Sequence, residues 1–320
     1  MTLAIGIDLG GTNMRAAVVD TSSQSAGFAH EIKVTLPATT PETVVGVIAD
    51  TVTKLGAAAG RSDLPIGIGI AAMLRGTTGI VDNAPNLGWR SVDFRGLLHA
   101  RLPENRVRLA NDVGAITFGE YSFGSGRGTE NLLCIYAGTG IGGGTIAGGR
   151  LVTGASGIAS EIGHSKVVLG PAARLCGCGQ RGCIEAYAGG RNLANRVRAE
   201  LAAGARSLAV ELAGGDASKV HAGHLDAAVA RGDAYATALW DEIAPLFGLV
   251  VANAVTLLNP ARVIFGGGVL WGAVELRQRV LSWYQELVNA PSGAACQIVE
   301  AALGDAAGIL GSASLAARSM

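Results

Sequence analysis

The chain has 320 residues, 49% of them hydrophobic and 16% charged, which excludes a disordered protein and provides the volume for one large or two modest domains. Lys and Arg (25) balance Asp and Glu (25), so the formal net charge is zero. Nucleic-acid binders and membrane-surface proteins need concentrated positive charge, so we expect neither kind of partner. The 48 glycines predict many tight turns or close approaches between backbone and ligand.

In chain order, the apolar runs predict an α/β fold. Strands at 3–9 and 14–19, joined by a glycine turn, form a hairpin. Thr40-Pro41-Glu42 predicts a helix start, with a hydroxyl cap, proline at the first helical position and an acid in the first turn. Pro245 should kink or break the last helix of the helical region 185–258. The other predicted elements are strands at 66–70, 106–109, 132–137, 144–147 and 263–265, and helices at 274–288 and 306–317.

No membrane or export segment is expected. The longest apolar stretch, 246–258, is interrupted by Gly248 and Asn253 and is shorter than the roughly 20 residues of a spanning helix. Asp8 lies inside the first apolar segment and no basic region precedes it, which argues against a signal peptide. We expect a cytoplasmic protein. Clustered cysteines in that reducing compartment favour a metal site over disulfides.

Two glycine loops have the composition of phosphate-binding turns. They are Asp8-Leu9-Gly10-Gly11-Thr12-Asn13 and Gly138-Thr139-Gly140-Ile141-Gly142-Gly143-Gly144. Glycine lets backbone N–H groups approach an anion closely, and a nearby carboxylate can hold the accompanying Mg²⁺. The alternative for the first loop is an ordinary hairpin turn. Two such loops on facing lobes would suit a nucleoside triphosphate held in a cleft.

The second loop also contains the pattern of a dinucleotide-binding fingerprint. Gly138, Gly140 and Gly143 have the G-x-G-x-x-G spacing, and Glu161 follows at about the distance that the fingerprint requires. However, residues 145–147 resume a strand where that unit demands a helix. No Gly-Lys-Ser/Thr follows, so the loop is not a P-loop either.

His164, Cys176, Cys178 and Cys183 are spaced as His-x11-Cys-x-Cys-x4-Cys. Three thiolates and one imidazole complete a tetrahedral shell for Zn²⁺ and leave no position for a catalytic water, so we expect a structural zinc. The alternative is three unrelated thiols. The remaining cysteines, Cys134 and Cys296, stand apart and are expected to be small core residues.

The zinc motif would gather further polar groups. Glu161 and His164 lie on one face if 161–164 forms a helical turn, and Glu185 follows the last cysteine by two residues. Zinc would then hold a histidine and two carboxylates near one another. The ring nitrogen of His164 that does not bind metal stays free for another hydrogen bond.

Several of these motifs, in this order, resemble the bacterial ROK sugar kinases, and within them the glucokinases. The resemblance covers almost the whole chain and includes both glycine loops and the stretches 161–164 and 176–185. It implies an actin-like, ribonuclease-H-like α/β kinase fold with two lobes and a cleft between them, assembled as a homodimer. The implied lobes are 1–115 plus 305–320, and 116–304 with the zinc loop.

Family roles follow from matched positions. Asp112 matches the catalytic base that takes the proton of the sugar 6-hydroxyl. The positions that match sugar contacts are Asn86, Asn111, Asp112, Glu161, His164 and Glu185. Those that match nucleotide contacts are Asp8, Gly10, Gly11, Thr12, Asn13, Gly138, Thr139, Gly140, Gly266, Gly267 and Gly268, and those that match the zinc ligands are His164, Cys176, Cys178 and Cys183.

The sequence departs from the family pattern at three places. Two additional residues separate His164 from Cys176, so the zinc loop should bulge. Residues 71–74 (Ala-Ala-Met-Leu) replace a small residue followed by Pro-Gly in the sugar pocket. Asn13 replaces a lysine near the phosphates.

The resemblance implies a glycolytic enzyme that phosphorylates a hexose with ATP and Mg²⁺, with glucose as the leading substrate. The alternatives are fructose, N-acetylmannosamine or N-acetylglucosamine as the sugar, polyphosphate as the donor, or a non-catalytic sugar-binding or regulatory protein. The repressors of the family have a helix-turn-helix module before the first phosphate motif. Asp8 arrives too early in this chain for such a module.

Overall fold

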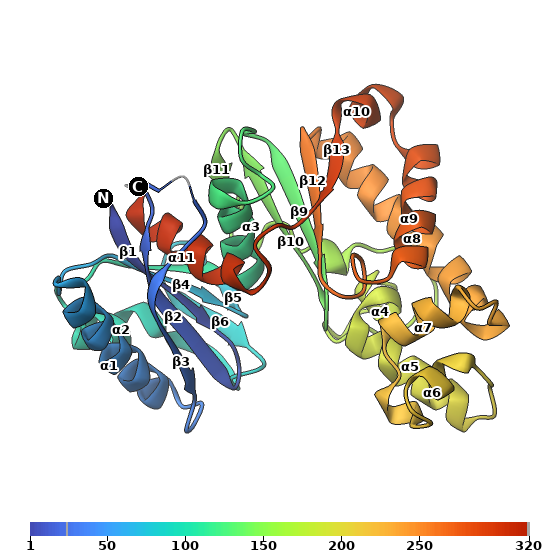
Figure 1. Cartoon of the computed structure of the whole chain (residues 1–320), viewed down its shortest axis with the longest axis horizontal. Helices are drawn as coiled ribbons and strands as arrows, with labels where there is room; N and C mark the ends of the chain where they lie inside the picture. The colour runs from blue at the N-terminus through green and yellow to red at the C-terminus, as the bar shows by residue number, and fades with distance from the viewer. Residues whose placement is uncertain (24, 319–320) are drawn as a thin grey trace. The chain divides into compact units, whose positions relative to one another are not determined.

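The computed structural model describes residues 1–23 and 25–318 (Figure 1). The chain divides into two compact units, and each contains most of one five-stranded sheet and its own core. The first unit comprises Met1–Leu132, Gly144–Ser160 and the stretch from Ala301, and the second comprises Leu133–Gly143 and Glu161–Glu300. The predicted lobe boundary between residues 115 and 116 falls inside helix α3 (Asp112–Phe123) and stays a prediction.

A mixed five-stranded sheet forms the centre of the first unit, with the strand order β3-β2-β1-β4-β8. The predicted hairpin is present, because β1 pairs antiparallel with β2 in the register Leu3 to Asp20. Both β1–β4 and β4–β8 are parallel pairs. The bounds are β1 Leu3–Leu9, β2 Asn13–Asp20, β3 Ala29–Thr35, β4 Ile66–Ile70 and β8 Val107–Asn111.

Alternate side chains of β1 point to opposite faces of this sheet, and different helices cover the two faces. Ile5, Ile7 and Leu9 pack in the core that includes α1 and α2, whereas Ala4 packs with α11. Helix α1 begins as predicted, because the Thr40 hydroxyl accepts a hydrogen bond from the amide of Thr43. The helices of this unit are α1 Pro41–Ala59, α2 Phe94–Arg101, α3 Asp112–Phe123 and α11 Ala307–Ala317.

Helix α11 lies unusually close to the sheet because the facing residues are small. A Cβ atom on Gly6 would lie 2.0 Å from the carbonyl oxygen of Ile309, and one on Gly67 would lie 1.8 Å from that of Ser312. Only glycine permits this approach. A small sheet of order β5-β6-β7 also belongs to this unit, with β5 Met73–Leu74, β6 Ile80–Ala84 and β7 Trp89–Asp93. The short turn η3 Gly304–Ala306 directly precedes α11.

The second sheet has the strand order β11-β10-β9-β12-β13, and the helices of the second unit supply most of its core. Its strands are β9 Leu132–Ala137, β10 Ile141–Ala147, β11 Arg150–Leu151, β12 Arg262–Gly266 and β13 Gln297–Glu300. The helices are α4 Glu185–Ala188, α5 Gly190–Ala202, α6 Leu208–Leu212, α7 Ala222–Val229, α8 Ala234–Leu258, α9 Val274–Leu287 and α10 Ala290–Ala295, with short turns η1 Ile162–His164 and η2 Ala217–Lys219.

Helix α8 continues through Pro245, so of the predicted kink or break the break is excluded, and the kink stays a prediction. The carbonyl that loses its helical partner belongs to Asp241, on an exposed turn where solvent can satisfy it. Buried Trp240 and Phe247 on the same helix favour its continuation. Among the described residues α8 alone is long and apolar enough to cross a membrane, but 44% of its most apolar window is buried in this core, which makes length and composition weak grounds for a membrane segment.

Candidate active site and metal loop

Two carboxylates lie at the carboxyl ends of parallel strands in the first unit. Asp8 is the penultimate residue of β1, and Asp112 follows the last residue of β8 as the first residue of α3. Strand β4 separates β1 from β8 and runs parallel to both. Both side chains therefore belong to the same edge of one sheet, where open α/β sheets bind ligands.

The electrostatics of this edge are unusual. Burial raises the pKa of Asp112 above its ordinary value. Burial also raises the pKa of Asp8, and the negative charge of Asp112 raises it further, while Arg15 opposes the rise. These two carboxylates thus interact electrostatically in a poorly solvated place. Perturbed carboxylates of this kind cluster at functional sites.

The two predicted asparagines of this unit have different settings. The Asn111 side chain caps α3, because its oxygen accepts from the amides of Val113 and Gly114 at 3.0 and 3.3 Å. Asn86 lies against the first glycine loop, where a Cβ on Gly11 would lie 2.7 Å from the Asn86 carbonyl oxygen. Asn111 is thus fixed by a structural role that its sequence context did not reveal.

The first glycine loop is a tight connection between β1 and β2. The amide of Gly10 donates to the carbonyl of Asn13 at 2.9 Å, and the amide oxygen of Asn13 accepts from the Thr35 hydroxyl at 3.0 Å. Neither Gly10 nor Gly11 has a positive φ. Position 11 therefore requires glycine because the backbone of Asn86 approaches it closely, and not because its backbone is left-handed.

The second glycine loop meets two other segments of the second unit. The carbonyls of Gly138 and Thr139 accept, both at 2.9 Å, from the first amides of helix α5, and a Cβ on Gly267 would lie 2.4 Å from the carbonyl oxygen of Ala137. Gly267 has φ +85°, which only glycine adopts readily. The structure therefore brings together two of the predicted nucleotide segments, 138–140 and 266–268. The third glycine of the fingerprint, Gly143, lies inside strand β10 (Ile141–Ala147) and not at the start of a helix, which excludes the dinucleotide-binding alternative.

The four predicted metal ligands converge in the second unit. One ligand atom from each of His164, Cys176, Cys178 and Cys183 lies within 4.8 Å of the others. We call residues 164–183 the metal loop. Its path is set by two isolated bridges, Lys166 to Cys183 and Leu175 to Arg181, and by the predicted turn at Glu161–His164, which is the 3₁₀ turn η1.

The spacing of the donor atoms fits a tetrahedral zinc site. His164 Nδ1 and Cys176 Sγ are 3.7 Å apart, as are the sulfurs of Cys178 and Cys183. Bonds of about 2.3 Å at tetrahedral angles place ligand atoms about 3.8 Å apart. The donor set is therefore of the right kind and at the right separation for zinc.

The surroundings of the thiols bear on their ionisation. Burial raises the pKa of the Cys176 thiol to about 12, so ionisation of this thiol at neutral pH needs a positive charge beside it, such as that of a bound metal ion. Lys166 contacts the sulfur of Cys183 at 3.0 Å, a neighbour that sequence reasoning did not single out. Of the other cysteines, Cys134 is fully buried as expected, whereas Cys296 is only partly buried at the edge of the core.

Both carboxylates predicted near the metal loop are found there. Glu185 Oε1 lies 3.7 Å from the sulfur of Cys176, and Glu185 Oε2 accepts from the amide of Ile141 at 2.8 Å. Glu161 Oε2 lies 3.9 Å from His164 Nε2, the ring nitrogen that does not face Cys176. Glu185 thus connects the metal loop with the second glycine loop.

One residue beside this site has a backbone conformation that the sequence did not predict. Ser160, directly before Glu161, has φ +67°, and its hydroxyl is hydrogen-bonded to that of Thr145 at 2.8 Å. A non-glycine residue in this region is strained. The strained position adjoins a predicted sugar-contact residue.

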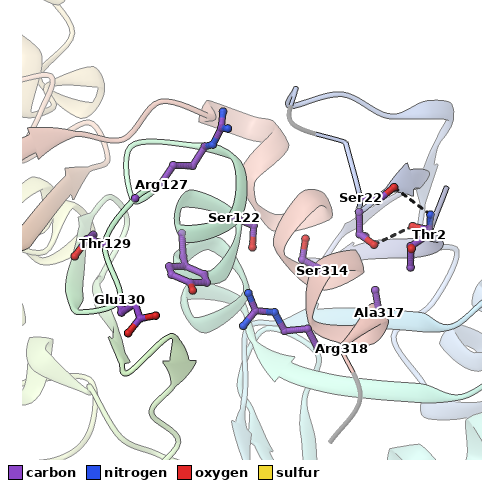
Figure 2. Close-up of a pocket in the computed structure, with 12 residues that line it drawn as sticks. Thr2, Ser22, Ser122, Arg127, Thr129, Glu130, Ser314, Ala317 and Arg318 are labelled. Atoms are coloured by element: carbon purple, nitrogen blue, oxygen red, sulfur yellow. Dashed lines mark hydrogen bonds between the residues drawn. The ribbon is translucent and has the colours of Figure 1, made fainter.

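A surface cavity of the first unit contains none of the predicted site residues. It has a volume of about 700 Å³ and lies at the carboxyl ends of α3 and α11 (Figure 2). Hydroxyls and charged groups line it, among them Ser122, Arg127, Glu130 and Arg318. The Arg318 guanidinium lies over the ring of Phe118 and donates to the carbonyl of Gly149, so it serves to hold the end of α11.

Comparison with known proteins assigns the chain to a family. The profile described as "ROK family" matches residues 4–319. The chain belongs to the ROK family. It is 37% identical to a glucokinase of Streptomyces coelicolor over 321 residues, covering 99% of this chain and 98% of the relative.

Two solved structures agree with this assignment. A ROK family glucokinase from Streptomyces griseus, crystallised with glucose and AMPPNP, superposes with a TM-score of 0.77 at 33% identity, covering 98% and 99% of the two chains. A ROK hexokinase from Thermus thermophilus gives 0.82 at 30% identity, covering 98% and 97%. The expected ROK kinase fold and the glucokinase-like hexose-kinase class are confirmed.

Proposed function

We propose that this ROK protein transfers the γ-phosphoryl group of ATP to the 6-hydroxyl of glucose. The observation that supports this most is the Asp112 carboxylate, partly buried at the carboxyl end of β8 with a raised pKa, in a chain that is 37% identical to a glucokinase. Phosphoryl transfer needs an in-line hydroxyl, a proton acceptor and positive groups on the phosphates, and little covalent work by the protein.

Asp112 is proposed as the general base. Its carboxylate accepts the proton of the sugar 6-hydroxyl as the oxygen attacks phosphorus. A raised pKa makes the carboxylate a stronger base, with a pKa closer to the pH at which the enzyme works. Asp8, on the same sheet edge, is proposed to hold Mg²⁺ directly or through water. Mg²⁺, when bound, neutralises developing charge on the phosphates.

The glycine segments are proposed to bind the nucleotide. Amides of Gly10–Thr12 in the first unit and of Gly138–Gly140 in the second are candidates for contacts to phosphate oxygens. The turn Gly266–Gly268 adjoins the second of these loops. Glycine at these positions keeps side chains out of the path of the nucleotide.

Polar side chains of both units are proposed to bind the sugar. Glu161, His164 and Glu185 of the second unit offer carboxylates and an imidazole, and Asn86 and Asn111 of the first offer amides, the groups that pair with vicinal hydroxyls. The metal is proposed to be a structural Zn²⁺, whose shell is filled by His164 Nδ1 and three thiolates. It would fix the His164 ring so that Nε2 faces the sugar.

A panel of sugars tests this proposal. Glucose, fructose, N-acetylmannosamine and N-acetylglucosamine are each offered with ATP and with polyphosphate, and phosphorylated product is measured. We expect glucose with ATP to give the highest kcat/KM. If another hexose gives a higher kcat/KM than glucose, that hexose is the substrate and the glucose assignment is wrong. If no sugar is phosphorylated, the result supports a sugar-binding protein instead.

We also propose a cytoplasmic homodimer. Apolar side chains stay exposed at the end of α8 and on α9, with Leu257 84% exposed, which supports burial against a second copy. Light scattering measures the mass of the assembly directly. A monomeric mass at micromolar concentration contradicts this assembly without affecting the catalytic assignment.

A further inference from the structure

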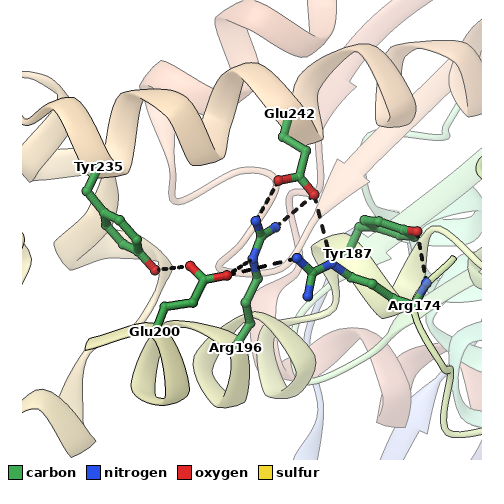
Figure 3. Close-up of polar contacts among 6 residues, drawn as sticks. All are labelled: Arg174, Tyr187, Arg196, Glu200, Tyr235 and Glu242. Carbon is green, nitrogen blue, oxygen red and sulfur yellow. Dashed lines mark hydrogen bonds and ion pairs between the residues drawn. The ribbon is translucent and has the colours of Figure 1, made fainter. Parts of the chain in front are cut away.

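A cluster of four charged side chains joins the metal loop to two helices of the second unit (Figure 3). Arg174 comes from the metal loop, Arg196 and Glu200 from α5, and Glu242 from α8. We call these four residues the clamp. Its two positive and two negative charges balance.

Arg196 makes the closest ion pairs of the clamp. Its two terminal nitrogens donate to the Glu242 carboxylate at 2.9 and 2.5 Å, and its Nε donates to Glu200 at 2.8 Å. The Arg196 side chain is only 13% exposed. A bidentate, half-buried arginine pair of this kind is directional and strong compared with a surface ion pair.

The two glutamates are in turn held in place for Arg174. Burial opposes ionisation of Glu200, but the Tyr235 hydroxyl, which donates at 2.7 Å, and the Arg196 guanidinium lower its pKa below the ordinary value. Arg174 then lies 3.9 Å from Glu200 and 3.9 Å from Glu242. The helices thus present Arg174 with a fixed pair of negative charges.

Arg174 is attached to the metal-binding residues through its backbone and its ring contact. Its amide donates to the Tyr187 hydroxyl at 3.0 Å, and its guanidinium lies over the Tyr187 ring. Tyr187 is buried in one small core with Cys176 and Cys183. The carbonyl of Arg174 accepts from the amide of Gly182 at 2.9 Å, which fixes the loop on both sides of Cys176 and Cys178.

We propose that the clamp holds the metal loop in its metal-binding geometry, with Arg174 as the positioning residue through which α5 and α8 act on Cys176. The loop has little regular structure, and Arg174 precedes the first cysteine by two residues, so its anchoring sets where that sulfur lies. This inference rests on the proposed metal centre. Loss of the clamp should speed release of the metal while the fold is retained.

Neighbouring residues of α8 provide a matched pair of variants. Glu242→Gln removes one charge of the clamp, whereas Asp241→Asn removes the adjacent charge, which pairs with Arg279 on α9 instead. Zinc-loaded protein is mixed with excess chromogenic chelator and the rate of zinc transfer is followed by absorbance. Outer-shell partners that touch a ligand alter metal affinity by about 10–100-fold. The more distant clamp should alter the release rate by about three- to tenfold, below that range.

We expect Glu242→Gln and Arg174→Met to release zinc faster than wild type by this factor, and Asp241→Asn to release it at the wild-type rate. Arg174→Lys keeps the charge and should restore part of the retention. Tyr187→Phe removes the acceptor of the Arg174 amide and provides an independent test in a variant of nearly unchanged volume. Melting temperatures measured in parallel separate loosening of the loop from general destabilisation.

Equal release rates in wild type, Glu242→Gln, Arg174→Met and Tyr187→Phe overturn the clamp and leave the metal centre intact. Equal acceleration by Glu242→Gln and Asp241→Asn also overturns it, because the effect then belongs to α8 in general. Wild-type protein purified without bound zinc, and unable to take it up, contradicts the metal centre itself and this inference with it.

Discussion

The carboxylate edge of the first unit and the metal loop of the second are held in different ways. Asp8 and Asp112 are fixed by three parallel strands in register and by a helix that starts at Asp112. Between His164 and Cys183 there are two isolated bridges in place of a sheet. The geometry of the first region therefore depends on backbone pairing, and that of the second depends on side-chain contacts and, as proposed, on a bound zinc ion.

The largest expected effect comes from removing the base. Asp112→Asn should lower kcat by about 10²–10⁴-fold, the usual contribution of a general base, with little change in glucose affinity. Because the folded state raises the pKa of Asp112, the charged carboxylate costs stability at neutral pH, and the amide should leave the melting temperature equal or higher. Steady-state kinetics, glucose titration and thermal melting check the three parts. A variant that keeps most of its kcat contradicts the assignment.

Removal of the metal should affect only the second region strongly. Chelation, or Cys178→Ser, should lower zinc content below one per chain, weaken glucose binding through His164 and lower the melting temperature. At a metal concentration 1,000-fold above Kd, the lost stabilisation amounts to about 4 kcal/mol. Cys296→Ser is the matched control, because Cys296 lies outside the cluster. Unchanged glucose affinity in zinc-free Cys178→Ser would separate the metal from the sugar site.

Backbone packing in the first region can be tested with two glycines. Gly67→Ala places a methyl group 1.8 Å from the Ser312 carbonyl oxygen and should lower the free energy of unfolding by about 1–3 kcal/mol or more. Gly46→Ala, inside α1 with no atom within 4 Å of the new Cβ, should raise it by about 1 kcal/mol. Urea unfolding measures both. Equal effects would mean that α11 does not constrain the sheet.

The smallest effect concerns pH. Burial raises the pKa of Asp112, and the base must be ionised, so log kcat/KM should fall on the acid side at a higher pH than the value of about 3.9 for an ordinary aspartate. Activity is then lost as pH falls through this raised pKa. A profile of kcat/KM between pH 4 and 8, with protein stability monitored, measures the apparent pKa of this loss of activity. An apparent pKa at or below that of an ordinary aspartate argues that the base is solvated.

Local signals predicted the features that depend on neighbouring residues. The hairpin of β1 and β2 follows from alternation around a glycine pair, and the start of α1 follows from Thr40 and Pro41. The metal ligands other than His164 lie within eight residues, so their spacing in sequence nearly determines their spacing in space.

Features that depend on distant residues could not be predicted. Arg196 and Glu242 are 46 residues apart, and nothing local marks them as partners. Helix α8 continues through Pro245 because buried neighbours outweigh the lost hydrogen bond, and that burial is a property of the folded core. The predicted role of Asn111 as a sugar contact stays a prediction, and its side-chain oxygen also caps α3.

A structure of the protein with glucose and a non-hydrolysable ATP analogue tests the role of Asp112 most directly. We expect an Asp112 carboxylate oxygen at hydrogen-bond distance, about 2.6–3.2 Å, from the sugar 6-hydroxyl, with that hydroxyl facing the terminal phosphorus. A 6-hydroxyl that contacts a different carboxylate, with Asp112 out of reach, would contradict it.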